Sequence, residues 1–200
     1  MKSIMLVTTN QGKVREVKKF FEDYNIITMA DAKIDYNIEE TGTTFEENAV
    51  IKVESIISYM EKKDTNQYLF MADDSGLEID FLNKEPGVYS SRYLGEDTPY
   101  EEKNKIILER MEGVLWSNRT ARFVCVIAII APNQKPIVTK GTIEGYIGFE
   151  AKGSNGFGYD PIFYINEETS LAELSAEEKN KISHRGKALS AMKLKIESEI

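Results

Sequence analysis

Apolar runs of strand length alternate with helical apolar stripes along this chain, and a polar cluster ends almost every run. Continuous or alternating apolar runs predict strands, whereas apolar residues three and four apart predict helices. The predicted strands are Ile4–Thr8, Asn25–Met29, Tyr68–Ala72, Leu77–Leu82, Ala121–Ala131, Ile137–Tyr146 and Pro161–Ile165. The predicted helices are Lys13–Phe21, one from Thr44, one from Thr98 to Met111, a short one from Ser175 and a longer one from His184.

Local motifs fix several of the boundaries. Capping boxes predict two helix starts, one pairing Thr44 with Glu47 and the other pairing Thr98 with Glu101. Residues 73–76 predict a turn, and residues 132–135 predict a hairpin between two long strands. This mixture predicts an α/β or α+β fold around one elongated mixed sheet, in a single domain over residues 1–200.

Composition narrows the function classes. The chain has 200 residues, a net charge of −8 and one cysteine, Cys125. An acidic surface disfavours nucleic acid as a partner, because nucleic-acid binding needs exposed basic residues. No apolar run approaches the ~20 residues of a membrane span, and one cysteine allows no internal disulfide. We therefore expect a cytosolic protein that binds neither nucleic acid nor membrane.

Two features offer positive charge or amides to an anion. Thr8-Thr9-Asn10-Gln11-Gly12-Lys13 stands where a strand meets a helix, and a helix start favours anions. A plain turn with an N-cap would give the same pattern. Lys52 falls on the edge of the apolar stripe of its helix, so its ammonium either extends to solvent or occupies a protected site.

Two carboxylate pairs are candidates for metal binding. Asp73-Asp74 follows an apolar run, and Glu39-Glu40 precedes the helix from Thr44. Strand alternation would send Asp73 and Asp74 to opposite sides, so we expect one of them to face a site. With one histidine and one cysteine in the chain, oxygen ligands favour Mg²⁺ over zinc. Solvated loop charges remain the alternative.

Two clusters near the C-terminus complete the set. Ser183-His184-Arg185-Gly186-Lys187 puts cations and a glycine in the first turn of a helix, against local preference, which often marks a functional site. A solvated basic turn is the alternative. In Gly156-Phe157-Gly158-Tyr159-Asp160-Pro161 an aromatic between glycines suits stacking on a base, although a turn with a core aromatic would also fit.

In order and separation, these clusters resemble those of the inosine triphosphate pyrophosphatase family. The matching stretches are Thr8–Glu16, Glu40–Ala49 with Lys52, Ala72–Leu77, Gly87–Tyr93, Phe157–Phe163, and Lys179 with Ser183–Gly186. Thr9 departs from the family, which often has glycine there.

The resemblance implies a two-lobed α/β fold with a central cleft, an elongated mixed sheet and a homodimer. It implies a catalytic base at Asp74 and Mg²⁺ ligands at Glu40 and Asp74. The substrate-binding residues that it implies are Thr8, Thr9, Asn10, Gln11, Gly12, Lys13, Lys52, Ser75, Phe157, Gly158, Tyr159, Asp160, Lys179, His184 and Arg185.

The expected activity is therefore Mg²⁺-dependent hydrolysis of non-standard purine nucleoside triphosphates to a monophosphate and pyrophosphate. Two alternatives remain open at this stage. One is an NTPase or phosphatase that releases inorganic phosphate, and the other is a nucleotide-binding protein without turnover. The adjacent carboxylates disfavour the last, because without a metal they would repel a triphosphate.

Overall fold

A computed structural model describes residues 2–60 and 66–200, and in these residues a six-stranded sheet runs in the order β2-β1-β3-β4-β5-β6. β1 is parallel to both β2 and β3, whereas β5 and β6 are antiparallel, so the sheet is mixed. The strands are β1 Ser3–Leu6, β2 Asn25–Thr28, β3 Tyr68–Ile79, β4 Thr120–Ile130, β5 Ile137–Ile147 and β6 Phe163–Tyr164. The predicted α/β class with one mixed sheet is confirmed.

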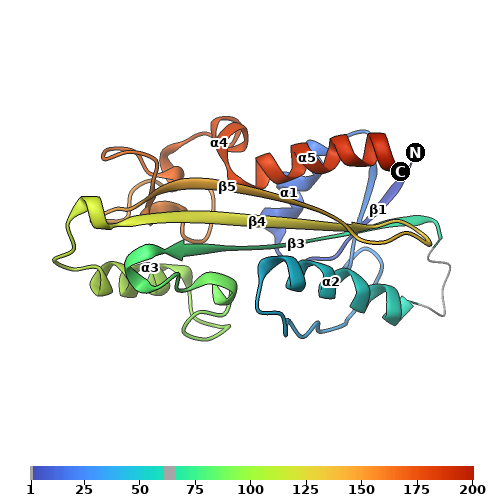
Figure 1. The fold of residues 1–200 in the computed structure, drawn as a ribbon, viewed down its shortest axis with the longest axis horizontal. Helices are drawn as coiled ribbons and strands as arrows, with labels where there is room; N and C mark the ends of the chain where they lie inside the picture. Colours follow the sequence, from blue (N-terminus) through green and yellow to red (C-terminus); the bar gives the residue numbers. More distant parts are fainter. Residues whose placement is uncertain (1, 61–65) are drawn as a thin grey trace. The chain divides into compact units, whose positions relative to one another are not determined.

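Five α-helices accompany this sheet in the described residues (Figure 1). They are α1 Gln11–Phe20, α2 Phe45–Met60, α3 Tyr100–Arg110, α4 Ala176–Ile182 and α5 His184–Glu199. All five predicted helices are present, and short 3₁₀ turns supply several of the connections. No helix in the described part of the chain is long and apolar enough to cross a membrane.

The chain divides into two compact units whose boundaries fall inside β3, β4, β5 and α5. Unit 1 comprises Met1–Asp74, Cys125–Lys140 and Ala188–Ile200, and unit 2 comprises Ser75–Val124 and Gly141–Lys187. Each unit has its own apolar core. The prediction of one domain over residues 1–200 stays a prediction.

In unit 1, apolar residues of β1 and β3 alternate between the two faces of the sheet. Ile4 and Leu6 pack with Val14 and Val17 of α1 and with Met192 of α5. In Figure 1, α2 lies on the opposite side of these strands from α1 and α5. Side chains of successive β3 residues therefore point toward different helices.

In unit 2, the core joins β3, β4 and β5 to α3 and to the loop before β6. Leu77 and Ile79 of β3 are fully buried with Ile107 of α3, Phe163 and Leu171. Tyr159, from the polar segment 156–160 that the sequence singled out, belongs to this core. The core therefore anchors that segment through the Tyr159 ring.

Four local predictions were wrong. The strand predicted at Leu77–Leu82 stops at Ile79, because Asp80–Leu82 form a 3₁₀ turn. The strand predicted at Pro161–Ile165 is reduced to Phe163–Tyr164, because Asp160–Ile162 form another 3₁₀ turn. β3 does not end at Ala72 in a turn, because residues 73–76 continue the strand to Ile79. Both aspartates are buried beside lysines, so their charges did not require a turn in solvent. The second capping box does not form, since Thr98 donates its hydroxyl to the carbonyl of Leu94 and α3 begins after Pro99 without a side-chain cap.

Candidate functional site

The strand–loop–helix at the start of unit 1 forms as predicted, and Asn10 is its N-cap. The Asn10 side-chain oxygen accepts from the backbone N–H groups of Gly12 at 2.8 Å and Lys13 at 3.2 Å. The expectation of free amides at this helix start was wrong for these two groups, because the cap occupies them. Thr8 and Asn10 are half-buried, whereas Thr9 and Gln11 are exposed.

Lys52 is buried and holds its ammonium in a protected site, which is the second of the two predicted outcomes. Its Nζ lies 2.7 Å from Glu40 Oε1 and 2.7 Å from Asp74 Oδ1. It also donates to the Asp73 carbonyl at 3.2 Å. The neighbouring α2 residues Ala49 and Val53 have no exposed surface, and they anchor the helix face from which Lys52 extends.

Lys13 pairs with the other aspartate. Its Nζ lies 3.0 Å from Asp73 Oδ2, so adjacent β3 residues contact cations from α1 and α2, as strand alternation predicts. We call Lys13, Glu40, Lys52, Asp73 and Asp74 the lysine–carboxylate cluster. It contains three carboxylates and two ammonium groups, which leaves one negative charge in excess.

The charges of Lys52 and Asp74 are compensated to different extents in this cluster. Burial would lower the pKa of Lys52, but the carboxylates of Asp74 and Glu40 outweigh burial and raise that pKa. Burial raises the pKa of Asp74, and the ammonium of Lys52 offsets only part of the rise. The lysine is therefore well compensated, whereas the Asp74 carboxylate is short of positive charge.

Unit 2 brings together a second group of predicted residues around the Phe157 ring. Lys179 Nζ lies 4.9 Å from the ring centroid and Arg185 Cζ lies 5.6 Å from it. Asp160 Oδ2 accepts from Lys179 Nζ at 2.5 Å and from the Phe157 N–H at 2.8 Å. Arg185 donates to the Ser75 hydroxyl at 3.0 Å. We call Ser75, Phe157, Asp160, Lys179 and Arg185 the Phe157 cluster.

Three other predicted residues are adjacent in sequence to members of this cluster and contact the surrounding part of unit 2. His184 is buried and stacks on Phe123, with ring centroids 4.7 Å apart. The Tyr159 ring lies in the unit 2 core, and its hydroxyl donates to the Ser90 carbonyl at 2.7 Å. The Gly158 carbonyl accepts from Asn104 of α3 at 3.1 Å.

The structure gives Gly186 a physical reason for its place in the first turn of α5. A Cβ built on Gly186 would lie 1.9 Å from the carbonyl oxygen of Asn180 in α4, so any larger residue would separate the two helices. Ser183 caps the turn by accepting from the Gly186 N–H at 3.0 Å. The glycine therefore serves helix packing, and it places Arg185 beside Phe157.

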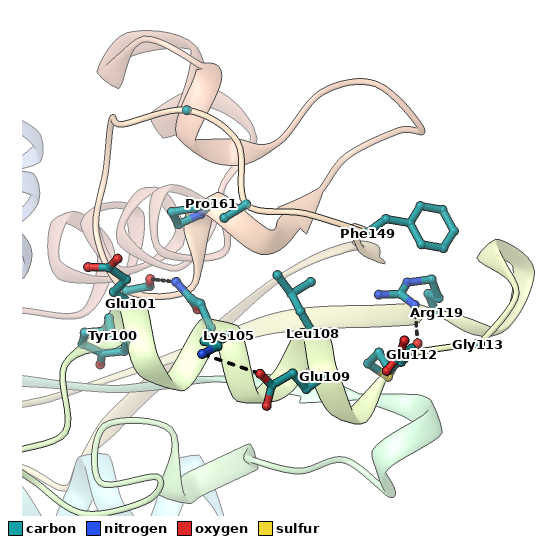
Figure 2. Close-up of a pocket in the computed structure, with 15 residues that line it drawn as sticks. Tyr100, Glu101, Lys105, Leu108, Glu109, Glu112, Gly113, Arg119, Phe149 and Pro161 are labelled. Carbon is teal, nitrogen blue, oxygen red and sulfur yellow. Dashed lines mark hydrogen bonds and ion pairs between the residues drawn. The ribbon is translucent and has the colours of Figure 1, made fainter.

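A cavity of about 870 Å³ lies along α3 in unit 2 (Figure 2). Its apolar lining includes Leu108, Phe149 and Pro161, and Glu101 and Glu112 add carboxylates. Among the predicted site residues that the structure describes, Gly158 is the one that lines it. The cavity therefore lies apart from the side chains of the Phe157 cluster.

Three polar residues that the sequence did not assign to a site hold backbone groups in their own unit. Asn48 binds the backbone of Gly42, Asn104 binds Gly158, and the Ser90 hydroxyl accepts from the Leu77 N–H at 2.9 Å. Ser90 and Asn48 stand inside the matching stretches quoted above, but their type alone indicates no contact. Only the fold brings them to a backbone group.

The Ham1 family model matches residues 4–195. The chain belongs to the Ham1 family. The predicted resemblance to a triphosphate pyrophosphatase family is thereby confirmed, because the curated relatives below carry that activity in their names. The family match spans both units, so it includes the lysine–carboxylate cluster and the Phe157 cluster.

Three relatives, each named dITP/XTP pyrophosphatase, match almost the whole chain. The Bacillus licheniformis protein is 47% identical over 192 residues, which are 94% of this chain and 95% of the relative. The Staphylococcus epidermidis protein is 44% identical, covering 100% of this chain and 98% of the relative. The Thermoanaerobacter pseudethanolicus protein is 49% identical, covering 96% and 94%.

Solved structures of family members share the fold. The Staphylococcus aureus Ham1 protein superposes with a TM-score of 0.86 at 41% identity, covering 100% of both chains. The HAM1 protein from Coxiella burnetii also gives a TM-score of 0.86, at 40% identity, covering 99% of this chain and 100% of that one. The arrangement of helices and strands is therefore that of the Ham1 family.

Proposed function

We propose that this chain hydrolyses the triphosphates of inosine, deoxyinosine and xanthosine to the nucleoside monophosphate and pyrophosphate, with Mg²⁺ as cofactor. The observation that carries the proposal is Lys52, buried between Glu40 and Asp74 at 2.7 Å from each. A buried ammonium among carboxylates suits a substrate that brings both negative phosphates and a metal ion.

The predicted enzyme class is confirmed by the relatives, which are named pyrophosphatases at 44–49% identity over nearly the full length. This Ham1 family chain is a hydrolase of nucleoside triphosphate anhydride bonds. Its substrates and metal are the finer part of the proposal. The lysine–carboxylate cluster supports the metal, and the Phe157 cluster supports the choice of base.

The residues of the lysine–carboxylate cluster fit a divalent metal. Asp74 Oδ2 is buried, and no hydrogen bond satisfies it within the described residues. No group of three or more histidine, cysteine, aspartate or glutamate residues suited to a metal occurs in those residues. Mg²⁺ commonly uses one or two carboxylates together with substrate phosphates, so Glu40 and Asp74 suffice to hold it. When bound, the metal would neutralise phosphate charge and lower the pKa of water.

Residues of the chain itself accept the proton and bind the phosphates. Asp74 accepts a proton from the water that attacks the α-phosphorus. Lys13 and Lys52 exchange their carboxylate partners for phosphate oxygens and stabilise the charge of the departing pyrophosphate. Asn10 caps α1 and so fixes the start of this helix. The same cap fixes the backbone from which Lys13 extends.

The Phe157 cluster is assigned to the base. The Phe157 ring offers a stacking surface for any base. Lys179 and Arg185 are donors beside that ring. His184, the residue before Arg185, is proposed as a third polar group for the base, and its ring stacks on Phe123. A 6-oxo purine presents an acceptor to such donors, whereas adenine presents an amino group there.

Product analysis tests the proposed reaction. The protein is incubated with inosine triphosphate and Mg²⁺, and pyrophosphate is separated from inorganic phosphate. We expect inosine monophosphate and pyrophosphate in equal amounts. Inorganic phosphate as the first product would indicate an NTPase or phosphatase, and binding without either product would indicate a non-catalytic nucleotide-binding protein.

The two lysines give a separate prediction about phosphate binding. Lys13→Ala and Lys52→Ala should each lower kcat/KM for every triphosphate by a similar factor, because the removed charge faces a group that all nucleotides share. The measurement is kcat/KM for inosine, xanthosine and adenosine triphosphates in each variant. A variant that mainly changes which base is accepted would show that its lysine does not serve the phosphates.

Two further expectations belong to the same proposal. We propose a homodimer, on the strength of the family resemblance, and a cytosolic location, where the nucleotide pool is found. Sedimentation of the purified protein would test the first, and fractionation of cells would test the second.

A further inference from the structure

The loop that contains Glu40 is held against α2 by a fully buried asparagine. Asn48 has no exposed surface, and its side-chain Oδ1 accepts from the Gly42 N–H at 2.8 Å. A backbone N–H can only donate, so the amide orientation of Asn48 is fixed by this contact. Glu40 stands two residues before Gly42, and its carboxylate contacts Lys52, as that of Asp74 does.

The other end of the same amide is unsatisfied in the part of the chain that the structure describes. Asn48 Nδ2 is buried and makes no hydrogen bond in the described residues. An apolar residue of similar shape would avoid leaving a buried donor unsatisfied, so packing alone does not explain an asparagine here. Within the described residues, the bond to Gly42 is the interaction that requires the amide.

Gly42 fits against Asn48 so closely that no side chain can be added. A Cβ at this position would lie 2.6 Å from Asn48 Oδ1 and 2.7 Å from Glu47 Cβ. Next to this contact, Glu47 Oε2 accepts from the N–H groups of Thr43 at 2.6 Å and Thr44 at 3.1 Å. The first turn of α2 therefore holds three consecutive residues of the loop, from Gly42 to Thr44.

Helix α2 contacts the loop at two points, the Gly42 backbone and the Glu40 side chain. Asn48 and Lys52 are four residues apart on α2, so they lie on one face of the helix, one turn apart. Asn48 fixes the backbone of the loop, and Lys52 binds the Glu40 side chain at the end of it. Glu40 is thus held toward Asp74, which also contacts Lys52.

We propose that Asn48 is a positioning residue for the metal site, which sets the distance between the carboxylates of Glu40 and Asp74 by holding Gly42. This inference rests on the proposed function, which assigns the metal to these two carboxylates. Residues that orient metal ligands commonly contribute about 10- to 100-fold to metal affinity. Asn48 should do so without contacting the metal itself.

The test is the affinity of the whole protein for Mn²⁺ without nucleotide, measured by electron paramagnetic resonance, with thermal unfolding recorded in parallel. Asn48→Leu keeps the approximate shape of the side chain and removes the bond to Gly42. We expect a dissociation constant about 10- to 100-fold higher than in the unmutated protein. The unfolding temperature should also fall, because the Gly42 N–H loses its acceptor.

Val53→Ala is the matched control for stability. Val53 is fully buried in the same helix but makes no contact that requires a polar group, so its truncation should lower the unfolding temperature and leave Mn²⁺ affinity unchanged. Gly42→Ala is the reciprocal variant, since it displaces the loop while Asn48 is intact. It should weaken Mn²⁺ binding as well, and combining it with Asn48→Leu should add less than the sum of the two effects.

Asp74→Asn separates this inference from the function on which it rests. If Asp74→Asn abolishes Mn²⁺ binding and Asn48→Leu leaves it unchanged, the positioning role is overturned while the metal assignment stands. If Asp74→Asn also leaves Mn²⁺ binding unchanged, the assignment of the metal to this cluster fails, and the role of Asn48 fails with it. Equal losses of affinity in Asn48→Leu and Val53→Ala would reduce Asn48 to a packing residue.

Discussion

Replacement of Asp74 by asparagine is expected to lower turnover of inosine triphosphate by at least ~10²-fold while nucleotide still binds. The amide keeps the size of the side chain but can neither accept the proton of the attacking water nor bind a metal as a carboxylate does. Steady-state kinetics give the turnover, and equilibrium binding of the triphosphate to the variant gives the affinity.

The same variant should not be less stable than the unmutated protein in the absence of metal. Burial raises the pKa of Asp74, so the folded state favours the uncharged form of this group more than the unfolded state does. Near neutral pH, above the usual pKa of an aspartate, its charge therefore works against folding, and a neutral asparagine removes that cost. Thermal unfolding of both proteins without metal checks this, and a large drop for Asp74→Asn would contradict it.

Asp73→Asn is the matched control for the catalytic assignment. Asp73 is the adjacent carboxylate, but its Oδ2 lies beside Lys13 and 3.9 Å from the Cys125 sulfur, on the other face of β3. We expect a smaller loss of turnover, transmitted through Lys13. Near-normal turnover in Asp74→Asn with an inactive Asp73→Asn would show that the base is Asp73.

The second large effect is the preference for 6-oxo purines over adenine. We expect kcat/KM for inosine and xanthosine triphosphates to exceed that for ATP by about 10⁴-fold, because donors that face the adenine amino group would be left unpaired. Lys179 and Arg185 provide donors at the Phe157 ring, whereas the ring itself does not discriminate between bases. Comparable kcat/KM for ATP and inosine triphosphate would contradict this role of the Phe157 cluster.

Arg185→Ala should narrow that gap, mainly by lowering the rate with inosine triphosphate. Lys187→Ala is the matched control from the same cationic stretch. Lys187 is exposed and donates to the Thr142 carbonyl, away from Phe157, so its removal should leave the ratio unchanged. A narrowed ratio in both variants would indicate a general loss of positive charge rather than a lost contact with the base.

The sequence predicted which helices and strands form better than it predicted where they end, above all where a strand meets a polar cluster. The helix at Thr44 begins as the capping box requires, with Glu47 accepting from the Thr44 N–H and the Thr44 hydroxyl accepting from the Glu47 N–H. The turn at residues 73–76 was wrong because paired carboxylates indicate solvent unless buried lysines compensate them. That compensation comes from α1 and α2, which are distant in sequence from β3.

The candidate site could be predicted as residue types but not as contacts. The position of Lys52 on the edge of an apolar stripe indicated a protected ammonium as one of two outcomes, and only the fold brought Glu40 and Asp74 to it. Asn48 gave no signal by itself, because a buried amide in a helix has many uses. Its bond to Gly42 depends on how the preceding loop folds back on α2.

The most direct test of the account is hydrolysis of inosine triphosphate in water labelled with oxygen-18, followed by mass spectrometry of both products. If water attacks the α-phosphorus, one labelled oxygen enters inosine monophosphate and none enters pyrophosphate. Label in pyrophosphate or in inorganic phosphate, with unlabelled inosine monophosphate, would show attack at another phosphorus and would contradict the account.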